Sequence, residues 1–200
     1  MLDDAAPMPP APGTRVPADE LAIFQAWIEA GSPADACGVG GSESGGEPEP
    51  NPFDVDPVCT SEQYWGDDDD GDPRMHPGRD CVSCHTEESD DDDVPDLVIA
   101  GTVYPTAHEP NDCYGASSVD LRVIVQSMTS GDEVSLTPNS SGNFLLHRGD
   151  APSGFAPPFQ VRVVDGERER LMPIPAAAGS CNGCHTQAGT MGAPGRVVAP

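Results

Sequence analysis

The feature that most constrains this chain is a short motif, Cys-x-x-Cys-His-Thr, which occurs twice, nearly a hundred residues apart. The first copy is CVSCHT at residues 81–86, and the second is CNGCHT at residues 181–186. On one helical turn, cysteines at positions i and i+3 lie on the same face, and the histidine follows directly. Each copy can therefore present two thiols and an imidazole to a single bound group.

Such a motif is the attachment signature of a c-type haem. The two thiols form thioethers with the vinyl groups of one porphyrin, and the imidazole becomes the proximal iron ligand. With five histidines in 200 residues, chance alone would put a histidine directly after a given Cys-x-x-Cys roughly one time in forty. It would do so after both pairs about one time in sixteen hundred. The sequence predicts two covalent haem c groups, one on Cys81, Cys84 and His85 and the other on Cys181, Cys184 and His185.

A zinc site and ordinary thiols are the alternatives. Both Cys-x-x-Cys pairs together would provide the ligands of one Cys₄ zinc site, but the spacing between them far exceeds that of zinc ribbons. The pairs would otherwise form disulfides or remain free thiols. We favour haem, because composition alone does not explain the repeated histidine.

The other three cysteines are Cys37, Cys59 and Cys113. Their number predicts one disulfide and one odd thiol, which suits an oxidising compartment. A bond between Cys37 and Cys59 would close a short loop, whereas one between Cys59 and Cys113 would tie the first motif to the segment that follows. The sequence leaves both pairings open, and we lean to the second.

The composition indicates a loop-rich and strongly acidic chain. There are 22 Gly and 23 Pro but only 5% aromatic residues, so loops and linkers occupy much of the chain. The formal net charge of −25 excludes nucleic acid and anionic membranes as sequence-independent partners and favours a redox partner with a basic surface. No apolar run approaches the roughly 20 residues that a membrane span requires.

Residues 1–36 contain a clear helix pattern at 17–30, PADELAIFQAWIEA, with Pro and acidic residues at its start and Gly31 after it. Together with the preceding PMPP, this region resembles the last part of a small cytochrome c domain. The resemblance implies that Met8 is the distal ligand of a third haem whose motif lies upstream. The alternative is a Pro-rich tail with one packing helix. Residues 37–58 are expected to be a flexible acidic linker.

The chain begins with MLDD and lacks the apolar stretch of a signal peptide. In the families that carry c-type haem, the group is attached after export. We therefore expect either that the natural N-terminus lies upstream or that the chain is a fragment, and we expect a periplasmic or cell-surface location.

Residues 96–172 show the pattern of short β-strands. The expected strands are 97–104, 119–128, 134–137, 142–147 and 159–164. In VDLRVIVQ, one face carries Val119, Leu121, Val123 and Val125. The pattern predicts a mainly β fold, a small antiparallel β-sandwich flanked by irregular haem-binding segments at 59–95 and 173–200, with one N-terminal α-helix. IAGTVY, LRVIVQ, LTPNSSGNFLL and FQVRVVDG are similar to carboxypeptidase regulatory-like, transthyretin-type sandwiches, which implies a scaffold or binding domain without catalytic residues.

Two acidic runs flank the first motif, at 67–70 and 90–93. Alignment of DDDDGD with the EF-hand loop fails, because Gly66 and Pro77 would occupy the first and twelfth ligand positions. We expect solvated charge, with an irregular cation site as the alternative. Acidic residues on both sides would lower the reduction potential of a haem and favour a cationic partner.

Each iron needs a sixth ligand or has an open coordination position. Sequence proximity favours Met75 or His76 for the first haem, and His108, in a loop after a strand, is a further candidate distal ligand. The remaining candidates, which we expect to have packing or surface roles, are His147, Met172 and Met191.

Over roughly residues 59–200, the chain resembles exported multihaem c-type cytochromes that carry a β-sandwich between haem-binding segments. The resemblance rests on RMHPGRDCVSCHT, GTVYPTAHEP and CNGCHT…GAPGR. It implies a periplasmic or extracellular electron-transfer protein whose iron cycles between Fe(II) and Fe(III), and we favour an electron carrier over an enzyme. The alternatives are a cell-surface binding module with zinc or disulfide Cys-x-x-Cys sites, and an open-site haem enzyme of the peroxidase type.

Overall fold

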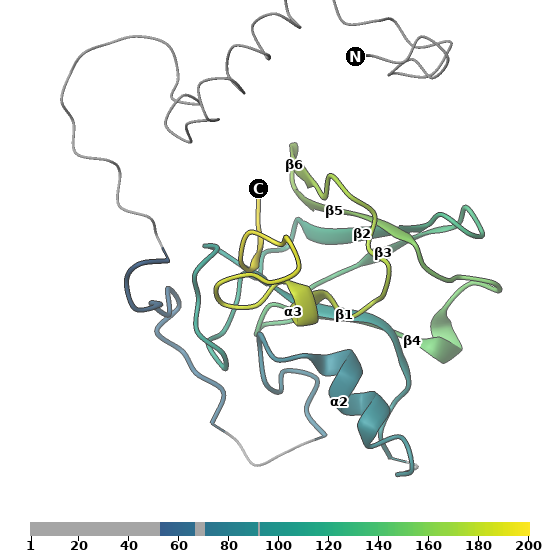
Figure 1. Cartoon of the computed structure of the whole chain (residues 1–200), viewed down its shortest axis with the longest axis horizontal. Coiled ribbons are helices and arrows are strands. Elements are labelled where there is room, and N and C mark those ends of the chain that lie inside the picture. The colour runs from purple at the N-terminus through teal and green to yellow at the C-terminus, as the bar shows by residue number, and fades with distance from the viewer. Residues whose placement is uncertain (1–52, 67–70, 92) are drawn as a thin grey trace, which may run out of the picture. The chain divides into compact units, whose positions relative to one another are not determined.

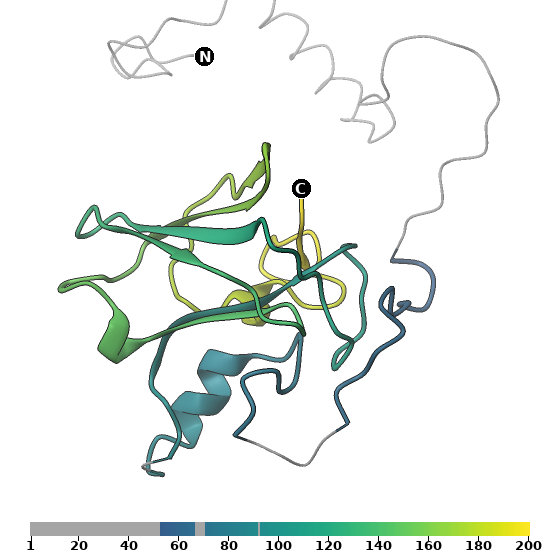
Figure 2. The same ribbon diagram turned by 180° about the vertical axis from the view of Figure 1, so that it is seen from behind.

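The structure is a computed structural model and describes residues 53–66, 71–91 and 93–200. Its helical elements are α2 (Cys81–Glu87), the 3₁₀ helix η2 (Arg148–Asp150) and α3 (Cys181–Cys184). Its strands are β1 (Leu97–Tyr104), β2 (Leu121–Ser127), β3 (Glu133–Leu136), β4 (Asn143–His147), β5 (Phe159–Asp165), β6 (Arg168–Leu171) and β7 (Val197–Val198). Figures 1 and 2 show these strands in two layers.

One layer has the strand order β4-β1-β7, and the other has the order β3-β2-β5-β6. All pairings are antiparallel except that of β1 with β7. In β2 and β5, alternate residues are buried, and Val123 lies opposite Val163. These inward-facing side chains meet Ile99, Val103 and Phe144 from the other sheet in one core. The expected small, mainly β sandwich is therefore present.

Strand β1 differs from its neighbours, because all eight of its residues are buried. One part of its surface faces the sandwich core, and the segments that carry the two Cys-x-x-Cys-His motifs cover the rest. These segments were expected to be irregular apart from the helical turn of each motif. Each contains that short helix, and the second also contributes β7 to the sheet, which was not expected.

Several strand boundaries differ from the expectation. Val119 was placed on the buried face of its strand, but it is 84% exposed and precedes β2, which begins at Leu121. Strand β6 was not expected, because its sequence RERL is fully exposed and has no apolar alternation. It forms only because the turn after Asp165 returns the chain alongside β5.

Cys59 and Cys113 form a disulfide, which confirms the pairing that we favoured. The expected helix at 17–30, Met8, Cys37, most of the linker and the acidic run at 67–70 lie outside the described residues. None of the helices within the described ranges has the length and apolar character needed to cross a bilayer.

Candidate functional site

Both motifs begin short helices beside β1 (Figure 1). Asp80 caps α2, because its side chain accepts hydrogen bonds from the backbone N–H of Ser83 at 3.1 Å and from the Ser83 hydroxyl at 2.8 Å. Ser180 occupies the same N-cap position at α3, but its side chain makes no capping hydrogen bond there and donates to Asp80 instead. Asp and Ser are favoured at N-caps because their oxygens accept hydrogen bonds from the free N–H groups of the first turn. The helical turn predicted from the cysteine spacing is present in both copies.

The two motif histidines have the same hydrogen-bonding pattern. His85 Nδ1 lies 3.0 Å from the Pro95 carbonyl oxygen, and His185 Nδ1 lies 2.8 Å from the Gly195 carbonyl oxygen. A carbonyl can only accept, so Nδ1 carries the proton in each ring. Within the described residues, no hydrogen bond involves Nε2 of either ring. An imidazole oriented in this way can bind a metal through Nε2 while the carbonyl fixes the ring.

The first cysteine of each motif is half-buried. Burial raises the pKa of the Cys81 thiol to about 11 and that of the Cys181 thiol to about 12, and nearby acidic groups contribute further. Cys84 is exposed, and Cys184 is half-buried. Because the thiolate is the reactive form, Cys81 and Cys181 are poor nucleophiles at neutral pH. The surroundings of Cys81 and Cys181 therefore do not activate these two thiols as nucleophiles.

The two motifs, a hundred residues apart in sequence, are in direct contact. The Ser180 hydroxyl donates to Asp80 Oδ1 at 2.6 Å, and Asn182 Nδ2 donates to the Arg79 carbonyl oxygen at 2.8 Å. Gly183 allows this approach, because a Cβ there would lie 2.4 Å from Ser180 Oγ and 2.7 Å from Asp80 Oδ2. These hydrogen bonds connect the N-terminal ends of α2 and α3. We call this contact, made by Arg79, Asp80, Ser180 and Asn182, the joint.

Thr102 of β1 holds both motif segments. Its hydroxyl accepts hydrogen bonds from the Gly78 N–H at 2.9 Å and from Asn182 Nδ2 at 3.1 Å, and it donates to Asn143 Oδ1 at 2.7 Å. The Thr102 N–H also donates to Asn182 Oδ1. One donor and two acceptors are the full capacity of a hydroxyl. Thr102 is completely buried, so these bonds are shielded from water.

Arg196 lies in the loop that fixes His185, and it is 2% exposed. Its guanidinium donates to the carbonyl oxygens of Glu109 and Gly78 and to Asn111 Oδ1, at 2.6–2.9 Å. It also lies 5.2 Å from the centroid of the Tyr104 ring. Burial lowers the pKa of the Arg196 guanidinium. These oxygen acceptors satisfy the hydrogen-bond donors of the buried guanidinium. They also connect the second motif to the segment before the first motif.

The candidate distal ligands differ in their hydrogen bonds. His76 Nδ1 lies 3.0 Å from Asp112 Oδ1, and no described residue bonds its Nε2. His108 has Nδ1 2.9 Å from the Gln187 carbonyl oxygen and Nε2 2.8 Å from the Val55 carbonyl oxygen. Ligation by His108 would therefore break one of these contacts, whereas ligation by His76 Nε2 would not. Met75 is half-buried, and its carbonyl oxygen accepts a hydrogen bond from Asn143.

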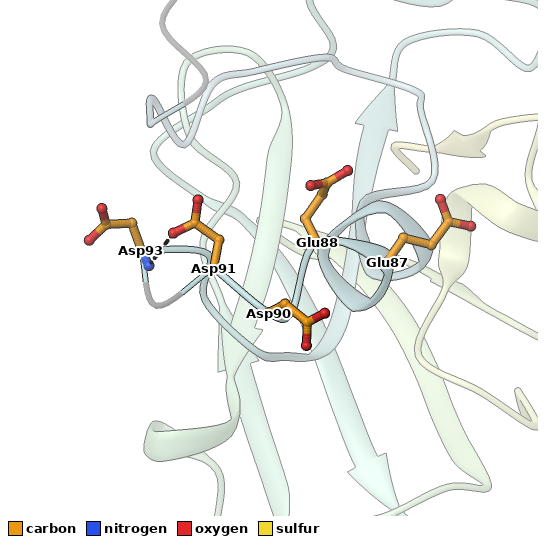
Figure 3. A pocket seen from close by; sticks show the side chains of 5 residues that line it. All are labelled: Glu87, Glu88, Asp90, Asp91 and Asp93. Atoms are coloured by element: carbon orange, nitrogen blue, oxygen red, sulfur yellow. Dashed lines mark hydrogen bonds between the residues drawn. The ribbon is translucent and has the colours of Figure 1, made fainter.

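A strongly acidic hollow of about 660 Å³ follows α2, lined by Glu87, Glu88, Asp90, Asp91 and Asp93. Figure 3 shows these side chains pointing to different sides rather than converging on one point. The one hydrogen bond drawn joins the Asp93 N–H to Asp91 Oδ1 at 3.0 Å. The described residues of this run are all exposed and place a dense negative charge at the surface next to the first motif.

The potential metal ligands of the two motifs do not gather at one point. Among the described residues, the one group of three ligand atoms within 4.8 Å is Cys59, Glu109 and Cys113. The two sulfurs of this group are joined in the disulfide, so they cannot act as thiolate ligands. A Cys₄ zinc ion would need four sulfurs about 2.3 Å from one centre, and the described arrangement does not provide this.

Sequence reasoning identified the cysteines and histidines but not the residues that join the two motifs. Asp80 and Ser180 carried a usable signal, because each is a favoured N-cap residue directly before a motif. Asn182 and Arg196 carried none, since an Asn inside a motif and an Arg near a chain end are both usually exposed.

No protein-family model, curated protein or solved structure matches this chain significantly.

Proposed function

We propose that this chain is an exported c-type dihaem electron-transfer protein in which the β-sandwich is the scaffold for both haems. The observation that carries the proposal is the repeated hydrogen bond of the motif histidines. In each copy, Nδ1 donates to a carbonyl ten residues further on, and no described residue bonds Nε2. Two unrelated loops with the same arrangement, each next to a Cys-x-x-Cys helical turn, indicate a common role.

The residues present fit a covalently bound haem in both places. Cys81 and Cys84 would provide the thioethers of the first, Cys181 and Cys184 those of the second, and His85 and His185 the proximal nitrogens. When bound, a haem supplies one-electron chemistry between Fe(II) and Fe(III). The chain contributes the orientation of the imidazoles through Pro95 and Gly195 and the acidic surroundings of the first motif.

The expected compartment and partner also have structural support. The Cys59–Cys113 disulfide suits an oxidising compartment, such as the periplasm or the cell surface. The acidic hollow lies directly after α2 and would attract a redox partner with a basic surface. The binding of such a partner should weaken as ionic strength rises.

The test is expression with export in a host that has c-type maturation machinery, followed by a haem-stained denaturing gel and an intact mass. We expect the mass of two covalent haems, with a stepwise loss in the Cys84→Ala and Cys184→Ala variants. The Cys37→Ala variant is the matched control and should keep both haems. A protein without haem would contradict the proposal, and bound zinc would then identify the metal-site alternative. Binding of carbon monoxide to a haem-loaded protein would instead favour an open-site enzyme.

A further inference from the structure

We infer that the two haems form one closely coupled pair that exchanges electrons directly, rather than two independent centres. This inference rests on the proposed function and concerns its internal arrangement. The order of the motifs along the chain does not imply it, because an entire sandwich separates them in sequence. The contact between α2 and α3 does.

The attachment points begin at a shared hydrogen bond. Asp80 and Ser180 directly precede the first cysteine of each motif, and their side chains are 2.6 Å apart. Asn182, between the two cysteines of the second motif, donates to the carbonyl of Arg79, two residues before Cys81. Each haem is tethered within a few residues of this joint, so the two tethers are adjacent.

The joint is also fixed in position. Thr102 binds the Gly78 N–H on one side and Asn182 on the other, inside a fully buried strand. Arg196 donates a hydrogen bond to the Gly78 carbonyl oxygen. The residue before it, Gly195, accepts a hydrogen bond from His185. These hydrogen bonds keep the two motif segments at a fixed distance from each other.

Two consequences follow from adjacency. Exchange between the sites would move one electron, oxidise one iron and reduce the other, with no bond made or broken and no proton transferred. In addition, an electron on one haem would disfavour the addition of an electron to the other, because like charges at short range repel in a partly buried site. A tenfold effect on the second reduction corresponds to a shift of 59 mV for a one-electron step.

The experiment uses the haem-loaded protein and two single-haem variants, Cys81→Ala/Cys84→Ala and Cys181→Ala/Cys184→Ala. Adjacent haems should give the wild type a bisignate circular dichroism couplet in the Soret band, which neither variant shows. In a redox titration, the wild-type curve should be broader than the sum of the two variant curves. The inference is overturned if the wild-type dichroism and titration both equal those sums. Absence of covalent haem from the wild-type mass would instead overturn the proposed function.

A matched pair of variants tests the joint without removing a haem. Ser180→Ala deletes one of the two hydrogen bonds between Arg79–Asp80 and Ser180–Asn182, whereas Ser83→Ala deletes a bond to the same carboxylate from within one motif. We expect Ser180→Ala to change the Soret couplet and Ser83→Ala to leave it unchanged. This comparison needs only the wild-type fold with both haems, so it stands even if a double cysteine variant does not fold. Equal effects of the two variants would contradict a role for the joint in positioning the haems.

Discussion

At the scale of single residues, Thr102 connects the sheet to both motifs through a hydroxyl whose hydrogen-bonding capacity is fully used. Thr102→Val keeps the shape of the side chain but leaves the Gly78 N–H and Asn182 Nδ2 without that acceptor. A buried donor without a partner costs about 1–3 kcal/mol. We expect a loss of that order in the free energy of unfolding, measured by urea denaturation.

Thr129→Val is the matched control for this variant. The Thr129 hydroxyl also donates a hydrogen bond, to the Pro157 carbonyl, but the residue is exposed. Water can replace that bond, so the expected change is below about 0.5 kcal/mol. Equal losses in the two variants would show that Thr102 acts only as an ordinary strand residue.

Asp80 makes the joint between the motifs sensitive to acid. Burial alone would raise the pKa of this carboxyl, but hydrogen bonds from Ser180 and Ser83 outweigh burial and lower it below its usual value. A lowered folded-state pKa means that the ionised group stabilises the fold above its ordinary pKa of about 4. That contribution is lost as the pH falls through the lower folded-state value.

We therefore expect the free energy of unfolding to decrease below about pH 4, and to decrease less steeply in Asp80→Asn. The amide oxygen can still accept hydrogen bonds, but it does not titrate. Asp150→Asn, at an exposed carboxylate, is the control and should follow the wild-type pH profile. Thermal denaturation between pH 2.5 and pH 7 measures the slopes. A profile for Asp80→Asn as steep as that of the wild type would exclude this origin of the acid sensitivity.

At the scale of elements, α2 and α3 are too short to form stable helices alone. They contain seven and four residues, whereas isolated helices shorter than roughly 12–15 residues are marginal in water. Their conformation therefore depends on β1 and on the joint. Gly179 is central to this attachment, because its carbonyl accepts the Ala100 N–H at 3.0 Å and a Cβ there would lie 1.9 Å from the Val98 carbonyl oxygen.

Gly179→Ala should detach the second motif from β1. The clash is with backbone, so it cannot be relieved by rotating a side chain, and we expect a destabilisation of about 1–3 kcal/mol. Gly149→Ala is the control, since a Cβ at Gly149 meets nothing within 4 Å. Limited proteolysis before α3 should cut Gly179→Ala faster than the wild type. Unchanged proteolysis and stability would mean that the fold tolerates a larger separation between residue 179 and β1.

The same elements show which parts of the fold were predictable. The apolar run LVIAGTVY identified β1 with its observed bounds, and alternation identified most of β2 and β5. Strand β7 was not predictable, because two residues carry no periodic pattern and their pairing depends on the end of the chain returning to β1. The complete burial of β1 was likewise hidden, since it depends on segments that precede and follow the sandwich.

At the scale of the whole molecule, the sequence proposes the candidate ligands of the site but does not show how the folded chain brings them together. Local spacing was sufficient to identify the cysteines and histidines. The contact between Asp80 and Ser180 was not predictable, because it spans a hundred residues and its geometry is set by the sheet between them. For the same reason, cysteine counting left the disulfide partner open and only the folded chain brings Cys59 to Cys113.

The disulfide closes a loop with a sequence separation of 54 that includes the entire first motif. A cross-link of that length restricts the unfolded chain by about 4 kcal/mol in the chain-entropy treatment. Cys59→Ala/Cys113→Ala should therefore be less stable than the wild type by an amount of that order in urea denaturation.

Cys37→Ala, which leaves the disulfide intact, is the control for the same measurement and should match the wild type. The position of the loop adds a second expectation. Residues Gln63 and Trp65 pair with the backbone of Tyr114 and Asp112 beside the disulfide, and Asp112 in turn binds His76 and Arg79 next to the first motif. Loss of the disulfide should therefore loosen the first motif before the second, and hydrogen exchange of α2 should rise more than that of α3. An equal rise in both helices would mean that the joint, rather than the disulfide, determines the local stability of the two motifs.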